Sequence, residues 1–318
     1  AVLGTGVIAN EMVQALEKMG KKLYAVANRT HSKAVEFAKK YGVEKVYDKI
    51  EDMFTDEETD IIYITTPHNT HIKFMIEALK NEKHVLCEKS ITLNSEELEE
   101  AVKIAKEKNL ILGEAMTIFN MPLYTELSEI VNSGKLGDVR MIQVNFGSYK
   151  EYDMNNRFFN RNLAGGALLD IGVYAISITR LFMTSKPDNV LSQVKYAPTG
   201  VDEQASIIMM NKEQQMSTIA LTLHSKQPKR VVIACEKAYI EITEYPRADK
   251  AKIVYTETGE IEEITAGMTA NALQYELQNM EESVKTGINK MKLEYTIDVM
   301  DIMTKLRKEW GMTYPEEE

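Results

Sequence analysis

The 318-residue sequence predicts an α/β protein in two parts, a helix-wound parallel sheet followed by an α+β domain with a mostly antiparallel sheet. The first observation is that apolar strand patterns and amphipathic helix patterns alternate six times before Ala115. The second is a set of short strand patterns between 190 and 265 with no helix among them. Parallel strands need helical crossovers, whereas antiparallel strands need only turns. We therefore expect two domains, residues 1–117 and 118–318.

The elements of the first domain are defined by apolar runs and by helix boundaries. Gly20 ends the first helix, and Asn94 with Glu97 three residues later forms a capping-box pattern at the start of another. The predicted strands are the opening apolar run, 23–27, 43–47, 60–65, 85–87 and 110–114. The predicted helices follow the first turn and then occupy 32–41, the stretch from Asn69 or Thr70 to Leu79, and 94–108.

The second domain begins with a helix over 123–132, which two glycines end, and a long alternating strand over 139–148. A polar stretch then leads to Gly165-Gly166 and an apolar helix. Short strands fill 190–265, and two helices near 271–284 and 296–310 close the chain.

Composition narrows the class of protein. The net charge of −10 argues against nucleic-acid binding, which depends on Lys and Arg neutralising phosphates. The most apolar run, 168–183, is interrupted by Asp170 and Arg180, so no membrane span is expected. Two cysteines are too few for a disulfide framework, which favours a cytoplasmic location. The chain starts inside its first strand, so the sequence leaves open whether a leader segment preceded it.

The first turn has the pattern G-x-G-x-x-A between a strand and a helix. In this pattern the first glycine makes the tight turn, the second lets the backbone approach a pyrophosphate, and the small third residue packs helix on strand. Short glycine patterns also occur in plain structural turns, but here further βα units follow. We therefore predict a dinucleotide-binding Rossmann domain whose phosphate-binding residues are Gly4, Thr5, Gly6, Val7 and Ile8.

The end of the second strand indicates which dinucleotide is bound. A site for NAD has an acidic residue about 20 residues after the glycines, where it holds the ribose 2′-hydroxyl. Here the strand ends without an acid, in Asn28-Arg29-Thr30. Arginine suits a 2′-phosphate, so NADP(H) is the predicted cofactor, although Arg29 also fits an ordinary surface arginine.

Four segments resemble the glucose–fructose oxidoreductase / inositol dehydrogenase (Gfo/Idh/MocA) family. They are 4–9 (GTGVIA), 65–71 (TTPHNTH), 84–89 (HVLCEK) and 165–174 (GGALLDIGVY), and their order and spacing fit along essentially the whole chain. The tyrosine that ends the last segment is similar to that of the dimeric dihydrodiol dehydrogenases and NADP-linked xylose dehydrogenases. The resemblance implies a Rossmann domain and an open sheet used for oligomerisation as a homodimer or homotetramer.

The resemblance also places further residues beside the cofactor and the substrate. The cofactor contacts that it implies are Thr66, Pro67, Asn69, His71, Glu88 and Lys89. Met116 follows a stretch that resembles the family's exit from the sixth strand near the nicotinamide. Where the family usually has Glu-Lys-Pro, this chain has Ser90 after Lys89, so the lysine lacks the restriction that proline imposes on its predecessor.

Lys89, Asp170 and Tyr174 are the predicted catalytic residues. Asp170 and Tyr174 are four residues apart and share one helix face, and a charged residue in so apolar a helix is costly unless it is paired or lines a site. We expect Tyr174 to exchange a proton with the substrate oxygen, Lys89 to supply positive charge, and Asp170 to orient the substrate or Lys89. A surface lysine, a capping Asp and a core tyrosine are the structural alternatives.

Two further patterns have competing interpretations. Arg157, with Asn156, Phe158 and Phe159, provides either a cation and aromatic walls for substrate or only a structural turn. The spacing of His68, His71, His84 and Cys87 is close to that of zinc ligands, but a crossover helix separates the two pairs, so we predict no metal.

Together these patterns predict an NADP(H)-dependent oxidoreductase that transfers hydride between nicotinamide and a secondary alcohol or carbonyl of a sugar, polyol or cyclic diol. The cofactor carries this chemistry and the protein positions it. The main alternative is a non-catalytic NADP-binding regulator of the same fold. Redox-assisted glycoside cleavage, which needs a tightly held NAD, is disfavoured by Arg29.

Overall fold

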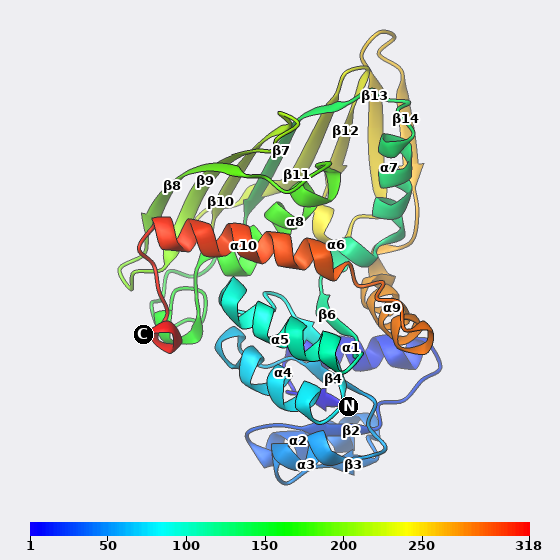
Figure 1. Ribbon diagram of the computed structural model, residues 1–318, viewed down its shortest axis with the longest axis vertical. Coiled ribbons are helices and arrows are strands. Elements are labelled where there is room, and N and C mark those ends of the chain that lie inside the picture. The colour runs from blue at the N-terminus through cyan, green and yellow to red at the C-terminus, as the bar shows by residue number, and fades with distance from the viewer. The chain divides into compact units, whose positions relative to one another are not determined.

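The computed structural model describes all 318 residues, which form two compact units (Figure 1). The first unit is residues 1–116 with 270–293, and the second is residues 117–269 with 294–318. These units differ from the predicted domains in the segment 270–293. Its helix α9 (Ala272–Thr286) packs on α1 (Val7–Lys18), because the apolar stripe of α9 joins the core of the first unit. The stripe comprises Leu273, Leu277, Met280 and Val284.

The first unit contains a six-stranded parallel sheet with the order β3-β2-β1-β4-β5-β6, as the strand–helix alternation predicted. Strand order reverses beside β1, which pairs with both β2 and β4, and ligands bind at such a switch point in open α/β sheets. The strands are β1 (Val2–Leu3), β2 (Ala25–Ala27), β3 (Lys45–Val46), β4 (Ile61–Ile64), β5 (His84–Glu88) and β6 (Leu112–Ala115).

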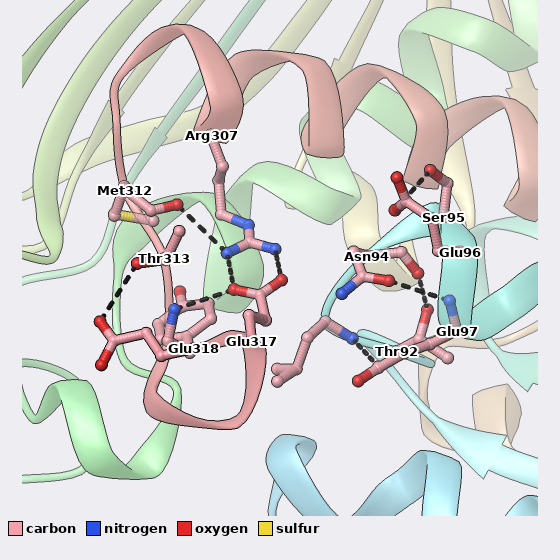
Figure 2. A network of polar contacts seen from close by, with 12 residues as sticks. Thr92, Asn94, Ser95, Glu96, Glu97, Arg307, Met312, Thr313, Glu317 and Glu318 are labelled. Atoms are coloured by element: carbon pink, nitrogen blue, oxygen red, sulfur yellow. Dashed lines mark hydrogen bonds and ion pairs between the residues drawn. The ribbon is translucent and has the colours of Figure 1, made fainter.

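Between these strands the chain forms helices whose apolar faces are buried. The predicted cap at Asn94 is present, because its side-chain oxygen accepts a hydrogen bond from the Glu97 amide at 2.9 Å (Figure 2). The short helix α3 was not predicted. Besides α1, the helices are α2 (His31–Tyr41), α3 (Ile50–Thr55), α4 (His71–Lys80) and α5 (Ser95–Glu107).

The second unit contains an eight-stranded sheet with the order β14-β13-β12-β11-β7-β10-β9-β8 (Figure 1). Every neighbouring pair is antiparallel except β7 with β10, which confirms the predicted mostly antiparallel sheet. The strands are β7 (Val139–Gly147), β8 (Asn189–Tyr196), β9 (Asp202–Met210), β10 (Met216–Thr222), β11 (Gln227–Cys235), β12 (Ala238–Thr243), β13 (Lys250–Tyr255) and β14 (Ile261–Thr265).

Helices cover one face of this sheet, and the opposite face is open. Helix α8 (Val173–Phe182) packs on β7 and β10, and α10 (Leu293–Glu309) is tied to α8 by an ion pair of 2.7 Å between Arg180 and Asp298. The shorter helices are α6 (Thr117–Asn120) and α7 (Pro122–Asn132). On the uncovered face, Leu191 of β8 pairs with Ile208 of β9, and these side chains are 62% and 45% exposed.

The helix predicted after Gly165-Gly166 has two parts, a π-helical turn over Leu168–Gly172 and then α8. Gly172 lies so close to β10 that an added Cβ would come within 2.9 Å of Leu221. By length and composition, the helical stretch 161–182 could cross a membrane, but 78% of its apolar 18-residue window is buried within the protein. A buried core helix has the same length and composition, so we interpret this stretch as part of the core of the second unit.

Candidate active site

The two glycines of the first turn differ in why glycine suits their positions. Gly4 has a φ of +113°, and a Cβ there would lie closer than 3.0 Å to the Thr65 hydroxyl, so the fold itself requires this glycine. Gly6 has an ordinary φ of −72°, and a Cβ there would meet nothing within 4 Å. The space over Gly6 lies at the N-terminus of α1, where backbone amides favour an anion.

The residues around this space suit a dinucleotide phosphate. Val7, the first residue of α1, is 78% exposed, whereas Ala9 is fully buried and lets the helix pack closely on the sheet. The Asn28 side chain donates to the Thr5 hydroxyl at 2.7 Å and so joins the end of β2 to the turn. This cradle, with an exposed apolar residue beside it, fits the pyrophosphate of NAD(P).

The end of β2 presents a cation and no carboxylate. The Asn28 side chain accepts from the Thr30 amide at 2.9 Å, which fixes the turn into α2. Arg29 and Thr30 are both exposed. Arg29 therefore has room to meet a phosphate on the adenosine ribose.

His71 holds two loops of this unit together. Its Nε2 lies 2.8 Å from the Thr66 carbonyl, and its Nδ1 lies 3.1 Å from the Ser90 carbonyl and 3.2 Å from that of Ile91. The side chain is fully buried, and this burial lowers the pKa of His71. The ring therefore holds the backbone of both loops in place, and the contact of His71 with the cofactor stays a prediction.

Lys89 follows the carboxyl end of β5, at the edge of the sheet where β1 and β4 also end. Its carbonyl oxygen lies 3.0 Å from Nε2 of His68, and the Lys89–Ser90 peptide bond is cis. The preceding residue, Glu88, accepts a hydrogen bond from the Tyr63 hydroxyl, and burial raises the pKa of Tyr63 well above its usual value. The backbone around Lys89 is thus held by the turn that follows β4.

The four side chains with zinc-like spacing have other partners. Nδ1 of His84 accepts from the Ile111 amide at 2.9 Å, and the Cys87 thiol faces the Ile91 carbonyl at 3.8 Å. Burial raises the pKa of Cys87 well above its usual value, which disfavours the thiolate that a metal requires. The structure contains no group of three or more His, Cys, Asp or Glu side chains arranged to hold a metal ion.

In the second unit, Asp170 and Tyr174 both lie on the helical segment that follows the glycine turn. The Asp170 carboxylate, 13% exposed, forms an ion pair with Arg157 at 3.8 Å. The guanidinium of Arg157 also stacks over Phe158 at 4.2 Å. Tyr174 is half-buried, with its ring centroid 6.1 Å from that of Phe146. The loop containing Arg157 is therefore connected to a predicted catalytic residue.

The structure adds information at two further positions. Met116, predicted beside the substrate, has a fully buried side chain, and its contact with a ligand stays a prediction. Asp202, which sequence reasoning missed, is fully buried, and its Oδ2 accepts from the Leu168 amide at 2.6 Å. The only signal was an acidic pair, Asp202-Glu203, at the start of an alternating strand pattern.

The fold and the dinucleotide cradle define an NAD(P)-binding oxidoreductase. Residues 1–116 match the model of an oxidoreductase family with an NAD-binding Rossmann fold, and residues 124–241 match the GFO/IDH/MocA C-terminal domain. The chain therefore belongs to the Gfo/Idh/MocA family, which confirms the resemblance found in the sequence. It is an NAD(P)-dependent dehydrogenase of this family.

Known proteins are similar to the chain over most or nearly all of its length. A trans-1,2-dihydrobenzene-1,2-diol dehydrogenase from Xenopus laevis is 29% identical and covers 99% of this chain and 98% of its own. The same-named enzyme from Mus musculus is 26% identical, again over 99% and 98%. An uncharacterized oxidoreductase from Rhizobium meliloti is 30% identical over 70% of this chain and 67% of its own.

Solved structures share the fold. An aldose-aldose oxidoreductase from Caulobacter crescentus, crystallised with glycerol, has a TM-score of 0.86 at 20% identity over 98% of this chain and 96% of its own. KijD10, a 3-ketoreductase from Actinomadura kijaniata crystallised with NADP and TDP-benzene, has a TM-score of 0.85 at 18% identity over 96% of both chains. At these identities the likeness concerns the fold alone.

Proposed function

We propose that this dehydrogenase uses NADP(H) and moves hydride between nicotinamide and a secondary alcohol or carbonyl of a sugar, polyol or cyclic diol. The observation that carries the cofactor choice is the end of β2, where exposed Arg29 stands and no acidic residue occurs among 28–30. Arginine binds a phosphate through a planar fork of donors, whereas an acid would repel the 2′-phosphate. NADP in the KijD10 crystals is consistent with this choice.

The substrate class is supported by what similar proteins are named for. One group is named for a cyclic diol, another for aldoses, and a third as a UDP-N-acetylglucosamine 3-dehydrogenase. The substrates in these names share a ring or chain carbon that carries a hydroxyl. The ion pair between Arg157 and Asp170 offers donors and acceptors for such hydroxyls.

Three residues have proposed roles in the reaction. When bound, the nicotinamide donates or accepts hydride at C4. The phenol of Tyr174 gives a proton to the substrate oxygen during reduction and takes one during oxidation. Lys89 supplies positive charge that favours the ionised form of an acid, and Asp170 orients the substrate through its carboxylate.

The open face of the second unit's sheet supports self-association, and we propose a cytoplasmic homodimer or homotetramer formed through this face. Leu191 and Ile208 pair across β8 and β9, so two large apolar side chains are exposed side by side on this face. An uncovered apolar surface of this kind is typical of an interface.

A single-turnover assay tests the proposed function. Protein loaded with NADPH is mixed with a pool of aldoses, ketoses, inososes and α-dicarbonyls, and the absorbance of reduced nicotinamide is followed beside the variant Tyr174→Phe. Loss of absorbance in the wild type alone supports the reductase and the role of Tyr174, and division of the pool then identifies the substrate. NADPH that binds but is never oxidised by any member of the pool counts against this substrate class.

A further inference from the structure

The segment with Asp170 and Tyr174 begins at a turn that is packed from two sides. A Cβ on Gly165 would come within 2.8 Å of the Arg157 carbonyl and 2.9 Å of that of Phe158. A Cβ on Gly166, where φ is +126°, would lie closer than 3.0 Å to Oδ1 of Asp202. Both glycines are therefore required for close packing. A displacement of the backbone at 157–158 or of Asp202 would move the start of the helical segment.

Asp202 supports this start from the sheet side. Besides accepting from the Leu168 amide at 2.6 Å, its carboxyl group faces the amides of Ala167 and of Asp202 itself. Its other oxygen, Oδ1, is buried with no hydrogen-bond partner. A buried carboxyl oxygen without a partner is costly, so the contact with Leu168 is made at some cost in stability.

The C-terminal tail supports the same turn from behind. The Tyr314 hydroxyl donates to the Gly165 carbonyl at 2.7 Å and is fully buried. The tail is fastened by Arg307 of α10, whose guanidinium forms bonds of 2.7 and 2.6 Å with the two carboxylate oxygens of Glu317 (Figure 2). Glu317 in turn accepts from the Tyr314 amide at 2.8 Å. The bidentate pair thus keeps Tyr314 in place.

We infer that Asp202 and Tyr314 are positioning residues for catalysis, which hold the first turn of the helical segment so that Asp170 and Tyr174 meet the substrate in a fixed orientation. This inference rests on the proposed role of Tyr174. It assigns to the C-terminal tail a part in turnover that no motif of the dinucleotide site indicates. Small displacements of a reacting group have large effects on rate, so the loss of either support lowers kcat.

The test compares Asp202→Ala, Asp202→Asn and Tyr314→Phe with a matched control, Asn211→Ala. Asn211 lies just beyond the other end of β9 and is also buried, and its side chain accepts from the Gln215 amide at 2.9 Å. Asp202→Ala is expected to lower kcat about tenfold to a hundredfold with KM for NADP(H) unchanged. Asp202→Asn keeps an acceptor for Leu168 and restores most of the rate. Asn211→Ala lowers Tm and leaves kcat unchanged.

Hydrogen–deuterium exchange provides a readout that does not depend on turnover. Amides of residues 166–174 are expected to exchange faster in Asp202→Ala and Tyr314→Phe than in Asn211→Ala. Combined with Tyr174→Phe, Asp202→Ala is expected to cause little further loss of kcat, because both act through one group. If Tyr174→Phe keeps full turnover, the proposed role of Tyr174 fails. The exchange data still test whether Asp202 and Tyr314 hold the helical segment in place. The inference would be overturned if both Asp202→Ala and Tyr314→Phe showed the amide exchange rates and the kcat of the wild type.

Discussion

The carbonyl oxygen of Lys89 lies 3.0 Å from Nε2 of His68, so the backbone of the predicted catalytic lysine is bound to the turn that follows β4. His71 of the same turn contacts the carbonyls of the next two residues, Ser90 and Ile91. The turn that begins at Thr66 and the loop with Lys89 therefore form one connected structure. Movement of either loop would be transmitted to the other.

The substitution His71→Ala should destabilise the first unit by about 1–3 kcal/mol, because it removes the ring N–H from among buried backbone carbonyls and leaves a cavity. Burial lowers the pKa of His71 below its usual 6.5, so the native state binds fewer protons than the unfolded chain. Its contribution is thus present above this pH and is lost as the pH falls, and the variant should lack that drop. Urea unfolding across this range measures both effects. His31→Ala, at a partly exposed histidine whose Nε2 lies 3.1 Å from Asp48, is the control and should change stability by less than about 0.5 kcal/mol.

The two glycines of the first turn should respond oppositely to alanine. Gly4→Ala places a Cβ against Thr65 at a positive φ and should unfold the first unit at lower denaturant. Gly6→Ala meets no protein atom within 4 Å and should leave stability unchanged or raised by about 0.4–1 kcal/mol. It should nevertheless weaken NADPH binding, measured by calorimetry, because the added methyl enters the space for the pyrophosphate. Unchanged affinity in Gly6→Ala would show that the phosphates lie elsewhere.

Much of the fold was predictable because its signals are local. The turn at Gly4, the cap at Asn94 and the alternation of strand and helix each depend on neighbouring residues, and all appear where the sequence predicts them. The strand patterns between 190 and 265 likewise predict an antiparallel sheet. Their side chains point alternately into the core and outward, so apolar and polar residues alternate in the sequence with a period of two.

What the sequence did not predict depends on long-range contacts. The stripe of α9 indicates an amphipathic helix, but nothing in it shows that the stripe joins the core of the first unit across more than 150 residues of intervening chain. The burial of His71 and Met116 and the contact between Asp202 and Leu168 also arise only when distant segments meet. The roles of Lys89 and Tyr174 remain predictions, because a proton transfer is tested by kinetics.

Arg29→Ser should weaken NADPH binding about tenfold to a hundredfold, as expected for the loss of a charge-assisted contact of about 1.5–3 kcal/mol. NADH binding should change little, because NADH has no 2′-phosphate. Fluorescence titration with NADPH and with NADH measures the ratio of the two dissociation constants. Lys39→Ser removes an exposed positive charge near the far end of α2 and serves as the control. Equal losses for NADPH and NADH in Arg29→Ser would contradict the assignment.

Tyr174→Phe should lower kcat about 10²- to 10⁴-fold, the range for the loss of a general acid or base, with KM for NADP(H) unchanged. Lys89→Met should also lower kcat, because the positive charge is lost, and should shift the pH–rate profile toward higher pH. Tyr239→Phe, at an exposed tyrosine of β12, is the control for the loss of a hydroxyl. A Tyr174→Phe enzyme with wild-type turnover would transfer the acid/base role to another group.

Asp202 should give the protein a measurable pH dependence of stability. Burial raises its pKa to about 7 from the usual 3.8, although the amides of Leu168 and Ala167 and the charge of Arg307 act in the opposite direction. Between these two pH values the native state binds more protons than the unfolded chain, so the free energy of unfolding falls as the pH rises. Asp202→Asn removes this dependence, so over that range the stability of the wild type relative to the variant should fall by up to about 1.4 kcal/mol for each step of one in pH. Urea unfolding of both proteins at several pH values measures it. Parallel stability curves would show that the Asp202 carboxyl group titrates alike in the folded and unfolded chains, contrary to its burial against Leu168.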